Sequence, residues 1–223
     1  LQKLKRYDEA INVYQKAISI KPKNEHFYNN MGSVFKDKGE FEKAIETYKK
    51  CISINPRNVD AIYNLGNTLK DKHQYDEAIK EYEKCISTNP NYIKAYLSIG
   101  NIFKDQGKLE KAIEIYKKVL LIKPNDARIY NNIGIIFKEV GELNKAIKIF
   151  REALLLKPND EIIYNNLGNT FHDQNNLDKA ISAFKKSITL NPNYISPYNN
   201  LGNIYKDQGK YKESIKFFNK ALL

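Results

Sequence analysis

Apolar residues fall in two stripes that return along the chain, and each stripe has the spacing of one helix face. In the first complete repeat, Tyr28, Met31, Gly32 and Phe35 follow the i, i+3, i+4, i+7 pattern. After a short break, a second stripe with helical spacing consists of Phe41, Ala44, Ile45, Tyr48, Cys51 and Ile52. The pattern predicts an all-α chain in which every repeat is a pair of amphipathic helices.

The helix pairs have a period of 34 residues (56 − 22 = 34), and each full repeat has one proline and one glycine in register. These are Pro22, Pro56, Pro90, Pro124, Pro158 and Pro192, with Gly32, Gly66, Gly100, Gly134, Gly168 and Gly202. Periods of this length are typical of solenoids. With the recurring glycine numbered position 8, residues 1–223 form a single array: a partial repeat at 1–24, full repeats at 25–58, 59–92, 93–126, 127–160 and 161–194, and a truncated repeat at 195–223.

Residues with special backbone preferences separate the two helices. Position 15 is glycine in four repeats, His73 in one and Asn175 in another. Glycine adopts a left-handed backbone freely and Asn or His tolerates it, so this position predicts a helix C-cap. His73 is therefore expected to be a turn residue. The recurring proline ends the second helix, since it cannot continue one.

A polar stripe is expected on the face of the first helix opposite its apolar stripe, at positions 2, 6, 9 and 13. Position 6 is asparagine in five of six repeats, and position 13 is acidic in all six. A carboxamide offers donors and an acceptor together, so a row of them suits contact with the main chain of an extended ligand. The candidate peptide-binding residues, here called the polar row, are Asn30, Asn64, Asn67, Asn101, Asn132, Asn166, Asn169, Asn200, Asn203, Asp71, Asp105 and Asp173.

Two features qualify the polar row. The chain is rich in Asn, Lys, Ile and Tyr throughout, so a compositional or structural origin of the asparagines is the alternative to a binding role. Apolar residues also interrupt the row, and exposed apolar residues on a binding surface are natural anchors for a partner. The candidate anchors, with packing against a neighbouring helix as the alternative, are Tyr63, Leu97, Ile135 and Ile162.

The repeat pattern resembles the tetratricopeptide repeat. The resemblance covers essentially the whole chain and rests on glycine at position 8, alanine or serine at position 20, an aromatic residue at position 24 and proline at position 32. It implies a right-handed α-α superhelical solenoid of antiparallel helix pairs, whose first helices line a concave groove that binds peptides or proteins. The chain departs from the family at position 4, which holds Tyr or Ile where Trp is frequent.

A protein-interaction scaffold is the function that the resemblance favours. The alternative is the substrate-recognition array of a protein O-linked N-acetylglucosamine transferase or a related glycosyltransferase. That more specific resemblance rests on short stretches such as Asn200–Asn203 and Lys206–Gly209. A chaperone-tail clamp is excluded, because the lysine that such a clamp needs at position 5 is absent.

Composition narrows the function further. The net charge is +11, but most of the lysines lie on second helices without stacking aromatics, so nucleic-acid binding is not expected. His26, His73 and His172 lie at unrelated positions, so no metal site, cofactor or catalytic group is expected in this chain, although a longer parent protein could be an enzyme. Cys51 and Cys85 are interpreted as packing residues. No signal peptide or membrane span is expected, which favours an intracellular, cytoplasmic and/or nuclear protein.

The two ends predict self-association. The chain lacks an initiator methionine and begins within a repeat, so it is interpreted as a piece of a longer array. A second helix is expected at residues 8–20 without its first helix, and no polar capping helix follows the last repeat. The residues expected to lose cover, and so to contact another copy, are Leu4, Tyr7, Ile11, Tyr14, Phe217, Phe218, Leu222 and Leu223.

Overall fold

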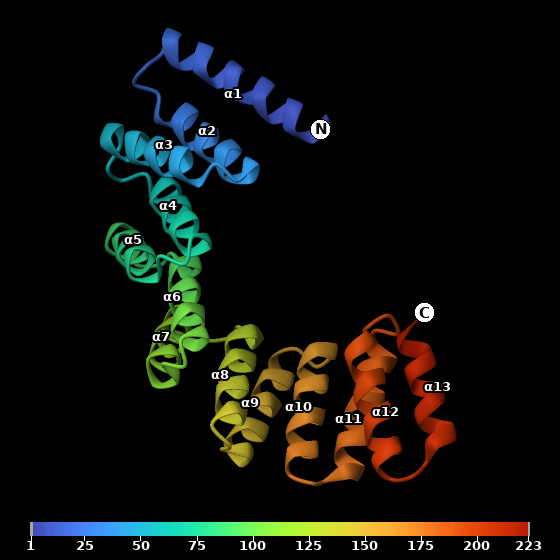
Figure 1. Cartoon of the computed structure of the whole chain (residues 1–223). Coiled ribbons are helices and arrows are strands. Elements are labelled where there is room, and N and C mark those ends of the chain that lie inside the picture. The colour runs from blue at the N-terminus through green and yellow to red at the C-terminus, as the bar shows by residue number, and fades with distance from the viewer. Residues whose placement is uncertain (1, 223) are drawn as a thin grey trace. The chain divides into compact units, whose positions relative to one another are not determined.

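The computed structural model describes residues 2–222, and it describes side chains from Arg6 onward. Over this range the chain is all-α, with thirteen helices and no strand (Figure 1). It divides into two compact units, residues 1–108 and 109–223. The all-α solenoid architecture predicted from the periodicity is confirmed.

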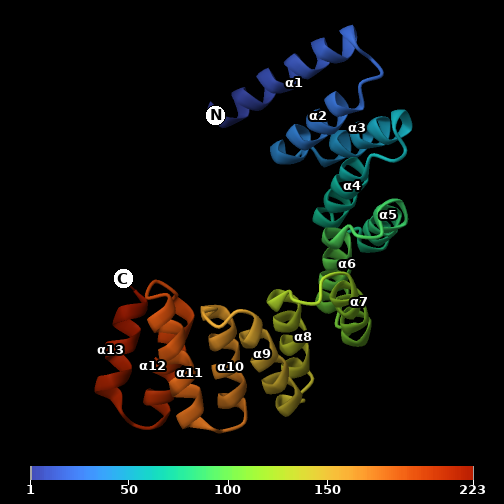
Figure 2. The same ribbon diagram turned by 180° about the vertical axis from the view of Figure 1, so that it is seen from behind.

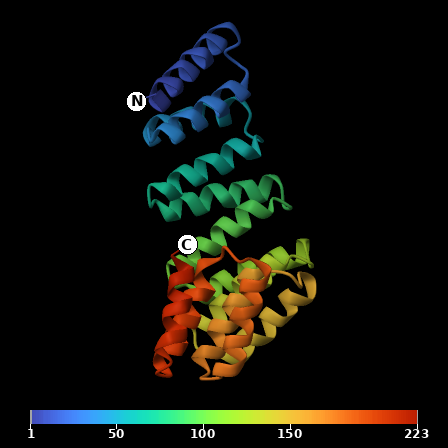
Figure 3. The same ribbon diagram turned by 90° about the vertical axis from the view of Figure 1, so that its right-hand side faces the viewer.

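Unit 1 contains the first six helices, each close to the length that the apolar pattern predicts. They are α1 (Gln2–Ile20), α2 (Glu25–Lys38), α3 (Phe41–Ile54), α4 (Val59–Asp71), α5 (Tyr75–Thr88) and α6 (Ile93–Asp105). Each packs against its neighbours in sequence, and α2 also contacts α4. Figure 3 shows the stacked pairs of this unit. Helix α1 begins six residues earlier than the predicted residue 8, because its polar first turns continue the helix.

Unit 2 contains the remaining seven helices. They are α7 (Leu109–Ile122), α8 (Ala127–Glu139), α9 (Leu143–Leu156), α10 (Glu161–Asp173), α11 (Leu177–Leu190), α12 (Ile195–Asp207) and α13 (Tyr211–Ala221). The first helices α8, α10 and α12 contact one another in order, and each packs on the second helix of its own repeat. Figure 2 shows α8 to α13 standing side by side.

The turns between paired helices form as position 15 predicts. His73 has φ 60° and Asn175 has φ 58°, and the position-15 glycines also have positive φ. His73 is thus a turn residue, and its Nδ1 lies 2.8 Å from the Tyr75 hydroxyl oxygen. The left-handed residue closes the first helix and lets the second helix return along it.

An aromatic ring on the second helix explains the glycine at position 8. A Cβ added to Gly66 would lie 2.7 Å from the ring of Tyr82, and one added to Gly168 would lie 2.6 Å from the ring of Phe184. Both rings are fully buried. The ring at position 24 therefore rests directly on the backbone of the first helix, which leaves no room for a side chain at position 8.

The buried face of the first helix is wider than the apolar stripe predicts. Positions 3 and 10 are also buried, as at Ala61 and Thr68 in α4 and at Ile163 and Thr170 in α10. The reason is that a first helix packs against second helices on two sides and against neighbouring first helices. The two buried threonines stay hydrogen-bonded by donating Oγ1 to the carbonyls of Asn64 and Asn166.

The two cysteines are buried and free. Cys51 Sγ lies 3.2 Å from the carbonyl oxygen of Glu25, and Cys85 Sγ lies 3.5 Å from that of Val59. Burial raises the pKa of Cys51 to about 11 and that of Cys85 to about 12. Both thiols are therefore neutral packing groups at neutral pH, as the sequence pattern predicts.

The terminal apolar residues are covered unevenly. Ile11 is buried and Tyr7 and Tyr14 are half-buried, so the predicted exposure at the first helix is wrong for Ile11, which packs inside unit 1. Phe217 and Phe218 are half-buried, and Leu222 is 85% exposed. The side chains of Leu4 and Leu223 lie outside the described residues.

Candidate functional site

The structure leaves every residue of the polar row at least partly accessible. Its exposed members are Asn30, Asn101, Asn203, Asp71, Asp105 and Asp173, and its half-buried members are Asn64, Asn67, Asn132, Asn166, Asn169 and Asn200. The expectation that the position-6 carboxamides stand free in solvent is wrong for Asn64, Asn166 and Asn200, because neighbouring repeats cover and bond them.

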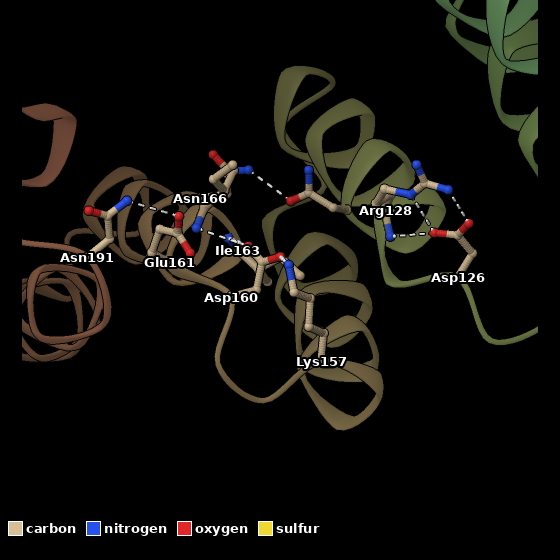
Figure 4. Close-up of polar contacts among 10 residues, drawn as sticks. Asp126, Arg128, Lys157, Asp160, Glu161, Ile163, Asn166 and Asn191 are labelled. Carbon is tan, nitrogen blue, oxygen red and sulfur yellow. Dashed lines mark hydrogen bonds and ion pairs between the residues drawn. The ribbon is translucent and has the colours of Figure 1, made fainter. Parts of the chain in front are cut away.

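Carboxamides at position 6 are tied to asparagines at position 5 of the preceding repeat. In unit 1, Asn64 Nδ2 donates to Asn29 Oδ1 at 3.1 Å. In unit 2, Asn166 Nδ2 donates to Asn131 Oδ1 at 2.9 Å, the bond drawn from Asn166 in Figure 4. Asn200 Nδ2 donates to Asn165 Oδ1 at 3.1 Å. These bonds fix the orientation of the position-6 amides.

The remaining hydrogen-bonding capacity differs along the row. Asn64 and Asn166 each use one amide proton, so each retains a second proton and its own Oδ1. Asn200 also donates to Asn169 Oδ1 at 2.9 Å, so both of its amide protons are engaged. Asn200 can therefore offer a ligand only an acceptor, whereas Asn64 and Asn166 can offer both a donor and an acceptor.

The asparagines at position 5 are functional candidates that the sequence analysis missed. Asn165 is only 5% exposed, and Asn29 and Asn131 are half-buried. The signal was present, because four asparagines share position 5, one residue before position 6 of the predicted row. Periodicity alone does not reveal that a side chain at position 5 reaches position 6 of the next repeat.

In unit 1 a tyrosine from the second helix supports position 9 of the same repeat. The Tyr82 hydroxyl donates to Asn67 Oδ1 at 2.8 Å, and the Tyr48 hydroxyl lies 3.0 Å from Ser33 Oγ. Burial raises the pKa of Tyr48 to about 12 and also raises that of Tyr82, so both hydroxyls stay protonated. The core ring thus also holds a polar group in place at the surface.

Lysine side chains form ion pairs with the position-13 aspartates of the row. Lys36 Nζ lies 3.1 Å from Asp71 Oδ2 in the next repeat, and Lys138 Nζ lies 3.8 Å from Asp173 Oδ2. Asp105 has Lys104 Nζ at 3.9 Å. The lysines at position 12 therefore partly neutralise the aspartates at position 13. The row then presents mainly carboxamide groups.

Carboxylates cap two first helices of unit 2, as Figure 4 shows. Asp126 accepts hydrogen bonds from Arg128 N, Nε and Nη2, the last at 2.7 Å. The Arg128 guanidinium holds the pKa of this carboxyl well below its usual range, at about 2, despite burial. Asp160 accepts from the backbone of Ile162 and Ile163 at 3.0 Å and pairs with Lys157 at 2.8 Å.

The four candidate anchors are not buried together. Ile162 is 48% exposed, whereas Tyr63, Leu97 and Ile135 are half-buried. Tyr63 packs against the rings of Tyr82 and Tyr92, and Ile135 packs against the core of unit 2. Ile162 is therefore the most accessible of the four.

Within residues 2–222, no group of three or more His, Cys, Asp or Glu side chains is arranged to hold a metal ion. No described helix combines the length and apolar character needed to cross a membrane.

Comparison with known families decides what kind of repeat this is. The model described as "TPR repeat" matches residues 2–39, 32–73, 100–141, 136–175 and 168–209, and models described as "Tetratricopeptide repeat" match 59–92, 81–114 and 196–223. The chain belongs to the tetratricopeptide repeat (TPR) family. No curated protein sequence matches it.

Solved TPR structures share the fold. MamA is 30% identical with a TM-score of 0.60, over 71% of this chain and 92% of MamA. The C-terminal part of a TPR repeat-containing protein from Cytophaga hutchinsonii is 21% identical with a TM-score of 0.77, over 97% and 90% of the two chains. YrrB, described as a TPR protein with an unusual peptide-binding site, is 21% identical with a TM-score of 0.61, over 82% and 95%.

Proposed function

We propose that this TPR chain is a protein-interaction scaffold that binds an extended peptide or protein segment along its first helices. The polar row is the contact surface, within the concave groove that the family resemblance implies. The observation that carries the proposal is the bonding of position-6 amides to position-5 amides, which pre-orients accessible carboxamides at the repeat spacing. A fixed polar group loses little conformational freedom when it binds a ligand.

Main-chain contact is the chemistry that these groups favour. Asn64 and Asn166 each retain a donor and an acceptor, which match the C=O and N–H of an extended peptide. Each such bond contributes only about 0.5–1.5 kcal/mol, so affinity grows with the number of repeats engaged. Binding of this kind tolerates many ligand sequences. The peptide-binding site of YrrB, which has the same fold, is consistent with the proposal.

The test compares two sets of substitutions. Random peptides long enough to span two repeats are selected on the wild-type protein by display, and the enriched peptides are titrated by calorimetry. The triple variant Asn64→Ala, Asn166→Ala and Asn200→Ala should bind them about tenfold more weakly or worse, since several bonds are lost. The matched control replaces exposed asparagines outside the row, Asn12, Asn144 and Asn219, by Ala.

Both variants must be folded for this comparison, and unfolding in urea checks that. The triple variant should lose some stability, because the Oδ1 atoms of Asn29, Asn131 and Asn165 lose their donors. An affinity for the selected peptides equal to that of wild type in a folded triple variant would show that the row is not the ligand surface.

The two finer expectations from the sequence stay proposals. We propose self-association through the terminal helices. At the C-terminal end, Tyr211 and Ile215 of α13 and Leu222, which follows it, are exposed, and a second copy would cover them. Light scattering at rising concentration tests this, and a strict monomer would contradict it. The glycosyltransferase alternative is tested by assaying whether peptides selected on this chain are sugar acceptors of such an enzyme.

A further inference from the structure

One carboxylate and two tyrosine rings meet at a single place in unit 1. Asp60, in the first turn of α4, accepts a hydrogen bond from the Tyr92 hydroxyl at 3.0 Å. Tyr63 follows three residues after Asp60 on α4, and residues at that spacing lie on one helix face. The ring centroids of Tyr63 and Tyr92 are 5.3 Å apart. The three side chains therefore converge.

The Asp60 carboxylate lacks a cationic partner. Tyr92 bonds Oδ1, while no side chain among residues 6–222 bonds Oδ2, and no lysine, arginine or histidine of that range forms an ion pair with Asp60. Asp60 is exposed, and both rings are half-buried with part of their surface accessible.

We propose that Asp60, Tyr63 and Tyr92 form a subsite for a cationic side chain, lysine or arginine, of the bound peptide. An ammonium or guanidinium group would pair with Oδ2 while lying against the tyrosine rings, whose faces attract cations. The inference rests on the proposed function and adds a side-chain preference to it. The subsite adjoins the row, because Tyr63 packs against the ring of Tyr82, whose hydroxyl donates to Asn67 Oδ1.

The corresponding place in unit 2 lacks both the carboxylate and the ring of Tyr63. There, position 2 is Ile162, position 5 is Asn165 and position 34 is Tyr194. Ile162 is 48% exposed, so a carboxylate substituted there would be accessible. The chain thus contains a natural comparison in which one unit has the acid and the other has an apolar residue.

The test uses two defined probes, acetyl-Gly-Gly-Lys-Gly-Gly-amide and the same peptide with norleucine in place of lysine. Each is titrated into the isotopically labelled full chain, and shifts of the nuclear magnetic resonance signals give affinities even when binding is weak. Wild type should bind the lysine peptide about fivefold more tightly than the norleucine peptide. Shifts should include the signals of Asp60, Tyr63 and Tyr92.

Substitutions test whether the preference for the lysine peptide depends on Asp60. Asp60→Asn retains an oxygen for Tyr92 and should abolish the lysine preference while leaving norleucine binding unchanged. Asp76→Asn, an equal charge change at an exposed acid of α5, should retain the preference. Ile162→Asp in unit 2 should strengthen lysine binding less than the native Asp60 does, because Asn165 replaces the Tyr63 ring there.

The outcomes separate this inference from the function on which it rests. Equal binding of the two peptides by wild type would overturn the subsite and leave main-chain binding intact. A lysine preference that survives Asp60→Asn would overturn it as well. If neither peptide shifts any signal of the row, both the subsite and the proposed function are wrong.

Discussion

The repeats of unit 1 and the later repeats of unit 2 pack different rings at the same position, and the difference extends to the surface. Position 24 is Tyr48 and Tyr82 in unit 1 and Tyr116 at the start of unit 2, whereas the later repeats of unit 2 have Phe150, Phe184 and Phe218. The rings of Tyr48, Tyr82, Phe150 and Phe184 are buried against a position-8 glycine. Only the tyrosines carry a hydroxyl, and those of Tyr48 and Tyr82 reach position 9 of the same repeat.

In the Phe184 repeat of unit 2, which lacks that hydroxyl, the position-9 side chain is bonded from the next repeat. Asn169 Oδ1 accepts from Asn200, whereas the corresponding Asn67 Oδ1 of unit 1 accepts from Tyr82. The bond to Asn67 is formed within one repeat, whereas the bond to Asn169 joins two repeats. The comparison teaches that one oxygen atom in the core changes which groups of the polar row remain available to a ligand.

The largest effect should come from the contact that both units share. Gly66→Ala and Gly168→Ala each place a Cβ within 2.7 Å of a buried ring, 2.7 Å at Tyr82 and 2.6 Å at Phe184. After the gain in helix propensity, each should cost about 2 kcal/mol of unfolding free energy in urea. Phe184→Leu should relieve part of the cost of Gly168→Ala. Additive effects of those two changes would show that the ring contact is not the cause.

Exchanging the rings should change stability less than the glycine substitutions do, and by unequal amounts in the two units. Tyr82→Phe leaves Asn67 Oδ1 without its donor and should cost about 1 kcal/mol. Phe184→Tyr places a hydroxyl where Asn169 Oδ1 accepts it, so its cost should be near zero. Unfolding in urea gives both values, and hydrogen exchange should report faster opening of α4 only in Tyr82→Phe. Equal losses in the two variants would remove the distinction between the units.

Acid should lower the stability of unit 2 by a small amount, because it protonates the carboxylate that caps α8. Unit 1 caps α2 and α4 with the neutral amides Asn24 and Asn58, whereas Asp126 caps α8. The folded pKa of Asp126 is about 2, below its unfolded value near 4, so its contribution is complete above pH ~4 and is lost as the pH falls toward ~2.

The expected loss is about 1 kcal/mol, because solvent screens the largely exposed Arg128. Asp126→Asn keeps a capping side chain that does not titrate, so the variant should lack this part of the acid sensitivity. Urea unfolding of both proteins between neutral pH and pH ~2 measures the difference. Parallel curves would show that Asp126 is not the titrating cap.

The sequence predicted the fold in detail and the candidate site only in outline. The period and the left-handed turn at His73 follow from local backbone rules, whereas the packing of the Tyr48 ring on Gly32 is seen only in the structure. The partner of Asn64 does not, because Asn29 is 35 residues away and reaches it only after two repeats have stacked. Likewise, the burial of Thr68 depends on helices packed on several sides of α4, which a single amphipathic stripe does not reveal.

The central claim is that the polar row binds the main chain of a ligand, and methylation of peptide nitrogens tests it most directly. A selected peptide and its N-methylated counterpart are titrated into the wild-type protein by calorimetry. Asn200, whose amide protons are both engaged, can only accept from a peptide N–H. The account predicts that methylation weakens binding about tenfold, and that Asn200→Ala reduces this penalty. Equal affinities of the two peptides for the wild-type protein would contradict it.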